Sequence, residues 1–394
     1  ISLVKNPAVV VGIAESGAKL AECESSLDEL SRLLDTAGGE VFCRVTQIKD
    51  SLDPRTCIGS GKVKEISELC RSMEINLVVF DFELSPAQIR NLENDIGDVM
   101  VIDRSMLILD IFALHAISGE GKLQVELAQL KYQSSRLVGL RNSLSRLGGG
   151  IGTRGPGESK LETDRRHLQR RVHALEAQIA EMDKNRKTMR ASRDKSGIPE
   201  VAIVGYTNAG KSTLLNALTD AGVLAENMLF ATLDPTARAL KMPDGREAML
   251  IDTVGFIRKL PHQLVESFKS TLDEVRESDI LLHVVDISHP DFESQIEVVN
   301  KTLNEIGAGD KKIIMVFNKI DAYSYIEKEE DDLTPVTKSN YSLEDWKKTW
   351  MAKGNTCIFI SAVEKDNYQD FRDLLYQEIR DMHAIRYPYD NFLY

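Results

Sequence analysis

The feature that most constrains the fold is an apolar strand that runs into a glycine-rich loop and then into a helical run. Residues 201–204 are all apolar, residues 205–212 read Gly-Tyr-Thr-Asn-Ala-Gly-Lys-Ser, and helical spacing begins at Thr213. Glycines let backbone N–H groups close around a phosphate, the lysine reaches its outer oxygens, and the serine hydroxyl is a ligand for Mg²⁺. The bare pattern arises by chance in roughly one chain of this length per hundred, but the flanking strand and helix make chance a minor alternative. The predicted phosphate-binding residues are Gly205, Tyr206, Thr207, Asn208, Ala209, Gly210, Lys211, Ser212 and Thr213.

A second apolar strand, at residues 249–251, ends in Asp252, Thr253, Val254 and Gly255. The Asp252 carboxylate is suited to hold Mg²⁺ through water, and the Gly255 N–H is suited to sense a γ-phosphate. Taken alone, this tetrapeptide is equally well explained as an ordinary turn.

Two later strands end in residues suited to a purine base. The strand at residues 313–317 is followed by an aspartate whose carboxylate can accept two hydrogen bonds from the N1–H and N2 amine of guanine, a donor pair that adenine lacks. The strand at residues 357–360 is followed by a loop whose backbone N–H can close over the base. The residues predicted to bind guanine are Asn318, Lys319, Ile320, Asp321, Ser361, Ala362 and Val363.

The order of these four motifs predicts both fold and ligand. Each motif follows a strand candidate, and doubly wound sheets bind their ligands at the carboxyl ends of the strands. Since four such motifs seldom coincide by chance, we predict a Ras-like, doubly wound P-loop domain that binds GTP. Residues 243–245, Pro-Asp-Gly, are typical of a hairpin turn, which predicts one antiparallel strand pair at an edge.

The first switch should lie between the helix that follows the phosphate-binding loop and the next strand. Thr232 is predicted to bring its hydroxyl to Mg²⁺ in the GTP state, with Thr236 as the fallback. Ser212 and Thr232 are then the predicted metal ligands, and Lys211, Thr232 and Gly255 the predicted catalytic residues. The predicted switch residues are Phe230, Ala231, Thr232, Leu233 and Asp234.

Intrinsic hydrolysis is expected to be slow. Phe256 follows Gly255 where a water-orienting glutamine often sits, and no cis arginine finger is evident. Because an external activator can raise such rates by up to about 10⁵, a partner that completes the site is expected. The side-chain oxygen of Asn208 is a hypothetical K⁺ ligand, and an ordinary loop asparagine is the equal alternative. Equal hydrolysis rates in Na⁺ and K⁺ would remove this hypothesis.

The 394 residues exceed one ordinary core, and their apolar pattern changes along the chain. Residues 1–118 alternate short apolar runs with helical patterns, which predicts a small N-terminal α/β domain. Residues 119–195 predict a helical, coiled-coil hairpin with a glycine-rich tip at residues 148–158. Residues 196–384 form the predicted P-loop GTPase domain.

Two shorter stretches stand apart from these domains. Residues 323–354 form an insertion in which five of the six residues from 327 to 332 are acidic, and we expect it to stay solvated. Residues 385–394 are expected to form a C-terminal tail.

The predicted hairpin has a helix-pairing seam and a basic tip. Residues 136–171 include nine basic and three acidic side chains, which gives this segment a charge of +6 in a chain whose net charge is −12. Arg146, Arg154 and Lys160 are the predicted contacts to RNA phosphates, although a solvated coiled coil is the ordinary explanation of such charges. The predicted seam residues are Leu123, Leu127, Leu130, Leu137, Leu168, Val172, Leu175, Ile179 and Met182.

The apolar runs and the cysteines of the sequence indicate which kinds of protein this chain is not. No apolar run approaches the roughly 18 residues that span a bilayer, so no membrane span is predicted. The five cysteines are scattered without a CxxC pair, which disfavours a zinc site or a disulfide framework and favours the reducing cytoplasm. We expect a monomer.

Taken together, the motifs resemble those of the HflX family of translational GTPases over nearly the whole chain. The resemblance also rests on residues 58–62 (Ile-Gly-Ser-Gly-Lys), 84–88 (Leu-Ser-Pro-Ala-Gln), 121–129 and 148–158. It implies a cytoplasmic GTPase that binds the large ribosomal subunit, is stimulated by it, and splits or rescues stalled ribosomes. In that picture the hairpin tip enters the peptidyl-transferase region of the ribosomal RNA.

Two other functions stay open. One is a guanine-nucleotide switch that docks a protein partner through the coiled-coil arms, and the other is a GTPase of ribosome assembly that binds immature large subunits. Substituting Arg146, Arg154 and Lys160 should abolish ribosome association but leave docking of a protein partner intact.

Overall fold

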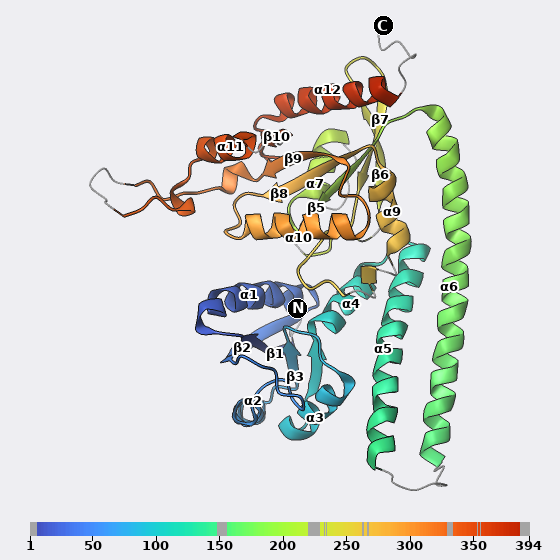
Figure 1. The fold of residues 1–394 in the computed structure, drawn as a ribbon, viewed down its shortest axis with the longest axis vertical. Helices are drawn as coiled ribbons and strands as arrows, with labels where there is room; N and C mark the ends of the chain where they lie inside the picture. The colour runs from blue at the N-terminus through green and yellow to red at the C-terminus, as the bar shows by residue number, and fades with distance from the viewer. Residues whose placement is uncertain are drawn as a thin grey trace, which may run out of the picture. The chain divides into compact units, whose positions relative to one another are not determined.

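The computed structural model of this chain divides into two compact units (Figure 1). Unit 1 comprises Ile1–Lys184 and Lys259–Ser267, and unit 2 comprises Asn185–Arg258 and Phe268–Tyr394. The residues that the structure describes are 6–147, 156–219, 229–231, 233, 235–261, 264–265, 268–328, 334–352, 354 and 356–386.

Unit 1 is built on a four-stranded parallel sheet in the order β2-β1-β3-β4 (Figure 1). The central strand β1 is buried without interruption from Ala8 to Gly12, as expected for a parallel strand covered on both faces. Val9 and Val11 pack with α2 and α3, whereas α1 packs against β1 and β2. The strands are β1 (Asn6–Ala14), β2 (Gly39–Ile48), β3 (Leu77–Phe80) and β4 (Met100–Asp103). The helices are η1 (Gly17–Lys19), α1 (Leu20–Thr36), α2 (Ser60–Ser72), α3 (Pro86–Ile96) and α4 (Arg104–His115).

Two long helices, α5 (Gly119–Leu147) and α6 (Pro156–Ser196), form the predicted hairpin. Leu127, Leu175 and Ile179 are buried together between the helices, which confirms this part of the predicted seam. The Arg171 guanidinium also donates to both carboxylate oxygens of Glu126, at 2.7 and 2.9 Å.

The three residues predicted to contact RNA are not all among the residues that the structure describes. Arg154 is outside the residues that the structure describes, as are the side chains of Arg146 and Lys160, although those two residues belong to α5 and α6. Their role stays a prediction.

Unit 2 contains a six-stranded sheet in the order β10-β9-β8-β5-β7-β6. Only β6 and β7 pair antiparallel, with Thr236 opposite Asp252, and this confirms the hairpin predicted at residues 243–245. The strands are β5 (Glu200–Gly205), β6 (Thr236–Lys241), β7 (Glu247–Asp252), β8 (Ile280–Asp286), β9 (Lys312–Asn318) and β10 (Thr356–Phe359). The strands β5, β7, β9 and β10 coincide with the four apolar runs singled out in the sequence, and the predicted α/β, doubly wound fold is confirmed.

Helices cover both faces of this sheet because alternate strand residues point to opposite sides. Val284 packs with α7 and α12, whereas its neighbour Val285 packs with α10 and α11. The helices of unit 2 are α7 (Lys211–Thr219), α9 (Lys269–Glu277), α10 (Phe292–Glu305), η2 (Ile320–Ala322), η3 (Lys338–Asn340), α11 (Leu343–Ala352) and α12 (Tyr368–Arg386).

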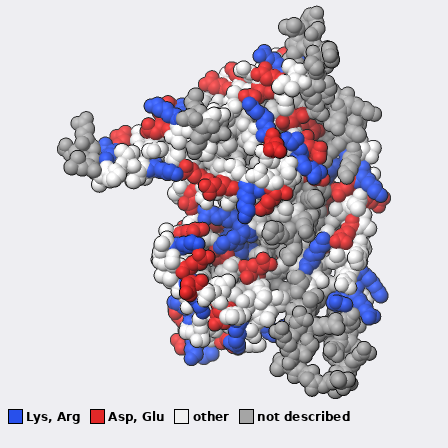
Figure 2. All heavy atoms as spheres, viewed as in Figure 1, with Lys and Arg blue, Asp and Glu red and all other residues white. Residues whose placement is uncertain are grey.

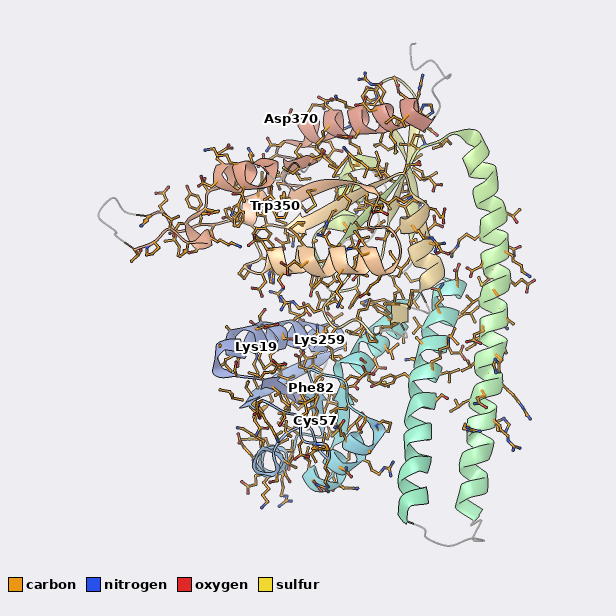
Figure 3. All side chains as sticks on the ribbon, in the orientation of Figure 1. Lys19, Cys57, Phe82, Lys259, Trp350 and Asp370 are labelled. Atoms are coloured by element: carbon orange, nitrogen blue, oxygen red, sulfur yellow. The ribbon has the colours of Figure 1, made fainter. Side chains whose placement is uncertain are left out.

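The expectation that residues 323–354 stay solvated is wrong for their second half. There the chain forms α11, whose Trp346 is buried and lies 5.0 Å from Phe292, ring centre to ring centre. Trp350, which is labelled in Figure 3, packs against Phe317. The run of acidic residues favours a solvated segment, but Trp346 and Trp350, four positions apart, share one face of a helix and bury it.

The surface of the described residues has no region of one charge sign on the face drawn in Figure 2, where acidic and basic side chains are interspersed. Among the described helices, none combines the length and the apolar character needed to cross a bilayer.

Candidate functional site

The predicted nucleotide-binding motifs meet at one edge of the sheet of unit 2. The strands β5, β7, β8, β9 and β10 are parallel, so their carboxyl ends lie on the same side. Gly205 ends β5, Asp252 ends β7 and Asn318 ends β9, while Ser361 follows β10 by two residues. This edge is where doubly wound folds bind their ligands.

The loop after β5 has a backbone that few residue types can adopt. Gly205 has φ +155° and Gly210 has φ +96°, both in the region that L side chains avoid. A Cβ at Gly210 would lie 2.4 Å from Asn318 Nδ2, and one at Gly205 would lie 2.3 Å from the Val284 carbonyl oxygen. Glycine is therefore required at these two positions by both conformation and space.

Lys211 lies at the centre of this loop with its ammonium group buried. Its Nζ donates to the carbonyl oxygens of Tyr206, at 3.0 Å, and Gly205, at 3.4 Å. Burial lowers the pKa of Lys211 to about 8, an effect that the nearby Asp252 carboxylate only partly offsets. Because this cation is poorly solvated, an approaching anion stabilises it more than it would stabilise a cation in water.

The beginning of α7 and the end of β7 bring two oxygen groups together. The Ser212 hydroxyl donates to Asp252 Oδ2 at 2.7 Å, and Asp252 is fully buried. Hydroxyl and carboxylate oxygens are the ligands that Mg²⁺ prefers. The pair therefore has the chemistry of a magnesium site.

Asn318 joins three of the predicted motifs. Its Nδ2 donates to the Ala209 carbonyl oxygen at 3.1 Å, and its Oδ1 accepts from the Ala362 N–H at 3.0 Å. Lys319, with φ +66°, places its Nζ 2.9 Å from the carbonyl oxygen of Asn208. These bonds fix the loops around the position of the predicted guanine site, with Asp321 exposed beside them and Val363 exposed in the last loop.

Asp286 lies among the predicted nucleotide-binding residues, although the sequence did not single it out. It is the last residue of β8, and its Oδ2 accepts from Lys319 Nζ at 2.7 Å. The available signal was an acidic residue directly after a largely apolar run, residues 280–285, since doubly wound sheets bind ligands at the carboxyl ends of their strands.

The loops that carry the predicted switches are bonded to the phosphate-binding loop. The Phe256 N–H donates to the Gly205 carbonyl at 3.0 Å, and its own carbonyl accepts from the Thr207 N–H at 2.8 Å. The Thr207 hydroxyl accepts from the Phe230 N–H at 2.8 Å. Thr207 thus contacts the beginning of one switch segment and the end of the other.

Part of the predicted switch falls outside the described residues. Thr232 and Asp234 are among the residues that the structure does not describe, and their roles stay predictions. The fallback ligand Thr236 begins β6, where it pairs in register with Asp252.

Comparison with known proteins supports the assignment of the domains to one family. Residues 24–113 match a family model described as GTP-binding GTPase N-terminal, and residues 115–193 match one described as GTP-binding GTPase Middle Region. Residues 200–319 match a model described as 50S ribosome-binding GTPase. The three models together cover most of the chain.

Individual relatives agree with these models. The chain is 49% identical to the GTPase HflX of Flavobacterium psychrophilum over 98% of its own length and 93% of the relative's. It is 48% identical to the GTPase HflX of Escherichia coli, covering 75% of this chain and 69% of the relative. Among solved structures, a GTP-binding protein from Sulfolobus solfataricus in complex with GDP is 26% identical, with a TM-score of 0.48 over 96% of this chain and all of that chain.

Proposed function

This chain belongs to the HflX family of GTPases, and from that premise we propose that it binds the large ribosomal subunit and hydrolyses GTP there to split or rescue stalled ribosomes. One observation carries the proposal most directly. The segment that matches the 50S ribosome-binding GTPase model, residues 200–319, contains the buried Lys211, the Ser212–Asp252 pair and Asn318 at one sheet edge.

In the proposed site, Lys211 holds the β- and γ-phosphate oxygens while backbone N–H groups of residues 205–212 surround the β-phosphate. Ser212 and Thr232 would hold Mg²⁺, with Asp252 acting through water, and the ion would neutralise phosphate charge. The short Ser212–Asp252 contact supports this assignment because both groups are hard oxygen donors.

Asp321 is proposed to select guanine by accepting hydrogen bonds from its N1–H and N2 amine. The bonds from Asn318 to Ala209 and Ala362 support this assignment because they position the surrounding loops before a nucleotide binds. A preformed pocket loses less freedom on binding and therefore discriminates better.

Hydrolysis by the chain alone is proposed to be slow. Gly255 can offer its N–H to the γ-phosphate, but the residue after it is Phe256, which is buried and carries no group that orients water. The missing group would come from the ribosome. The hypothesis that Asn208 binds K⁺ also stays open.

The affinity for GDP is expected to fall as the pH rises above about 8. In the protein without nucleotide the pKa of Lys211 is about 8, whereas a bound diphosphate would keep the ammonium group charged. Binding then takes up a proton above that pH, so the dissociation constant should rise by up to about tenfold per pH unit. Titration with a fluorescent GDP analogue between pH 7 and 9 measures this slope. An equally steep slope in Lys211→Arg, which stays charged, would contradict it.

Purified large ribosomal subunits are expected to stimulate GTP hydrolysis by the purified chain at least about tenfold. Phosphate release is measured with and without subunits, with Lys211→Ala as the blank. Absence of stimulation, with slow basal turnover intact, would overturn the ribosome-activated function and favour a switch that docks a protein partner.

A separate measurement distinguishes splitting from assembly. Under the proposed function, the chain with a non-hydrolysable GTP analogue should convert intact ribosomes into subunits in sucrose-gradient sedimentation. Binding only to immature large subunits would support the assembly alternative.

Replacing Arg146, Arg154 and Lys160 by alanine should remove ribosome binding, because phosphate contacts depend on these charges. We place this activity in the cytoplasm and assign it to the monomer.

A further inference from the structure

The carboxylate of Asp286 is held in a fixed direction at the carboxyl end of β8. Asp286 lies opposite Asn318 in the parallel pairing of β8 with β9, and the next residue, Ile287, donates its N–H to the Asn318 carbonyl oxygen at 3.1 Å. The Oδ1 atom of Asp286 accepts from the Ser288 hydroxyl at 2.5 Å and from the Ser288 N–H at 3.1 Å. Because both the backbone and Oδ1 are held, the remaining oxygen, Oδ2, has a defined position.

Lys319 is the partner of this remaining oxygen. Its Nζ lies 2.7 Å from Asp286 Oδ2 and 2.9 Å from the carbonyl oxygen of Asn208 in the phosphate-binding loop. The Lys319 side chain is 27% exposed and that of Asp286 is 14% exposed. A charged hydrogen bond that is largely shielded from water is stronger than one on the open surface. The ammonium group is therefore fixed at two points, one on β8 and one on the phosphate-binding loop.

The aliphatic stem of Lys319 crosses from the loop proposed to read guanine to the loop proposed to hold the phosphates. Lys319 directly follows β9 and precedes Asp321 by two residues, and its Nζ reaches the carbonyl oxygen of Asn208. The neighbouring Asn318 joins the same two loops through Ala209. A nucleotide bound to both loops would therefore lie beside the Lys319 stem.

The negative charge of Asp286 by itself would oppose nucleotide binding. Burial is the main reason that the pKa of Lys211 falls to about 8, and the charge of Lys319 lowers it further, so Lys319 and its partner lie near the phosphate-binding lysine. A carboxylate in this place repels an approaching phosphate. Its presence is therefore better explained by what it does to Lys319 than by any contact with the nucleotide.

From these contacts we propose that Asp286 is a positioning residue of the nucleotide site, which holds the Lys319 side chain along one side of the guanine position before a nucleotide binds. The inference rests on the proposed function, because it concerns how the same site gains affinity for guanine nucleotides. Without the carboxylate, the flexible lysine side chain samples orientations that the bound state excludes. Binding must then order this side chain, and the affinity falls accordingly.

The first test measures the affinity of the full chain for GDP by titration with a fluorescent GDP analogue. Asp286→Ala should weaken binding by about three- to tenfold, which is the effect of having to order one long side chain on binding. If charge alone counted, loss of the carboxylate would instead strengthen the binding of this anion. Equal or tighter binding in Asp286→Ala would therefore overturn the inference.

A second measurement separates the positioning of Lys319 from a general effect on the loop after β8. In a chain that already carries Lys319→Ala, the further change Asp286→Ala should weaken GDP binding by less than about twofold, since the side chain that Asp286 positions is gone. A loss as large as in the wild-type background would mean that Asp286 acts through its loop, and it would overturn the role toward Lys319.

Asp286→Asn carries the same test if the alanine variant does not fold. The amide has nearly the same shape and keeps an oxygen that can accept from Lys319, but it loses the charge. It should weaken GDP binding by about two- to threefold, less than alanine does. Equal or tighter binding in this variant would again contradict the inference.

Glu378→Ala is the matched control. Glu378 pairs with Lys312 Nζ at 3.1 Å, and Lys312 begins β9, at the opposite end of the strand from Lys319. The variant breaks the same kind of ion pair in the same unit, and it should leave the GDP affinity within about twofold of the wild type. A loss equal to that of Asp286→Ala would count against a special role of Asp286. Failure of the wild-type chain to bind GDP would instead overturn the proposed function.

Discussion

Replacing Lys211 by alanine is expected to lower kcat for GTP hydrolysis by about 10²–10³, the loss typical of removing one preorganised electrostatic contact to a transition state. The Lys211 ammonium group is buried, and it donates to the main-chain carbonyl oxygens of Gly205 and Tyr206 in its own loop. Transfer of the phosphoryl group increases charge on the oxygens that this cation would face. Single-turnover phosphate release, with saturating enzyme, measures the effect separately from binding.

The same variant should not lose stability in the absence of nucleotide. Burial lowers the pKa of Lys211 to about 8, so below that pH folding must bury a charge that the unfolded chain keeps in water. Thermal unfolding at pH 7 checks this point. Lys312→Ala is the matched control, since Lys312 pairs with Glu378 near the surface of the same unit. Equal kcat in Lys211→Ala and Lys312→Ala would remove Lys211 from the catalytic residues.

Replacing Asp321 by asparagine is expected to weaken GTP binding by about 10²–10³-fold and to give XTP the higher affinity. An aspartate accepts from the N1–H and N2 amine of guanine, whereas an asparagine amide offers a donor that repels the amine and suits the 2-oxo group of xanthine. The neighbouring bonds of Asn318 and Lys319 do not involve this side chain. Competition of both nucleotides against a fluorescent analogue measures the change.

The control for this exchange is Asp310→Asn, which alters an exposed aspartate in the turn before β9. It should leave both affinities as in the wild type. If Asp321→Asn lowered GTP affinity without any gain for XTP, Asp321 would support the loop and would not read the base.

Four strands of unit 2, β5, β7, β9 and β10, could be predicted because each is a short apolar run that is followed by residues with a local chemical role. Gly205 and Gly210 illustrate the reason. Their backbone torsions demand glycine whatever the rest of the chain does, so their spacing with Lys211 indicates the loop directly. The antiparallel β6–β7 pair was equally local, since its turn residues adjoin both strands.

The second half of the 323–354 insertion could not be predicted in this way. The run of acidic residues lies in the stretch 327–332, which gives no information about α11. The burial of Trp346 depends on Phe292 of α10, which lies far away in the sequence. Composition averages over a window, whereas packing is decided by the partner that the fold supplies. Asp286 could not be predicted for the same reason, because its contact with Lys319 depends on which strands the fold places side by side.

What the sequence by itself determined is the class of fold and the residues of the nucleotide loops, because backbone torsion, strand periodicity and turn chemistry act over a few neighbouring residues. Only the tertiary structure decided which of those loops are bonded to one another, that Lys211 is desolvated, and that Lys319 meets Asp286, 33 positions earlier in the chain. Desolvation and long-range ion pairs depend on which surfaces the fold brings together, and no local pattern records that choice.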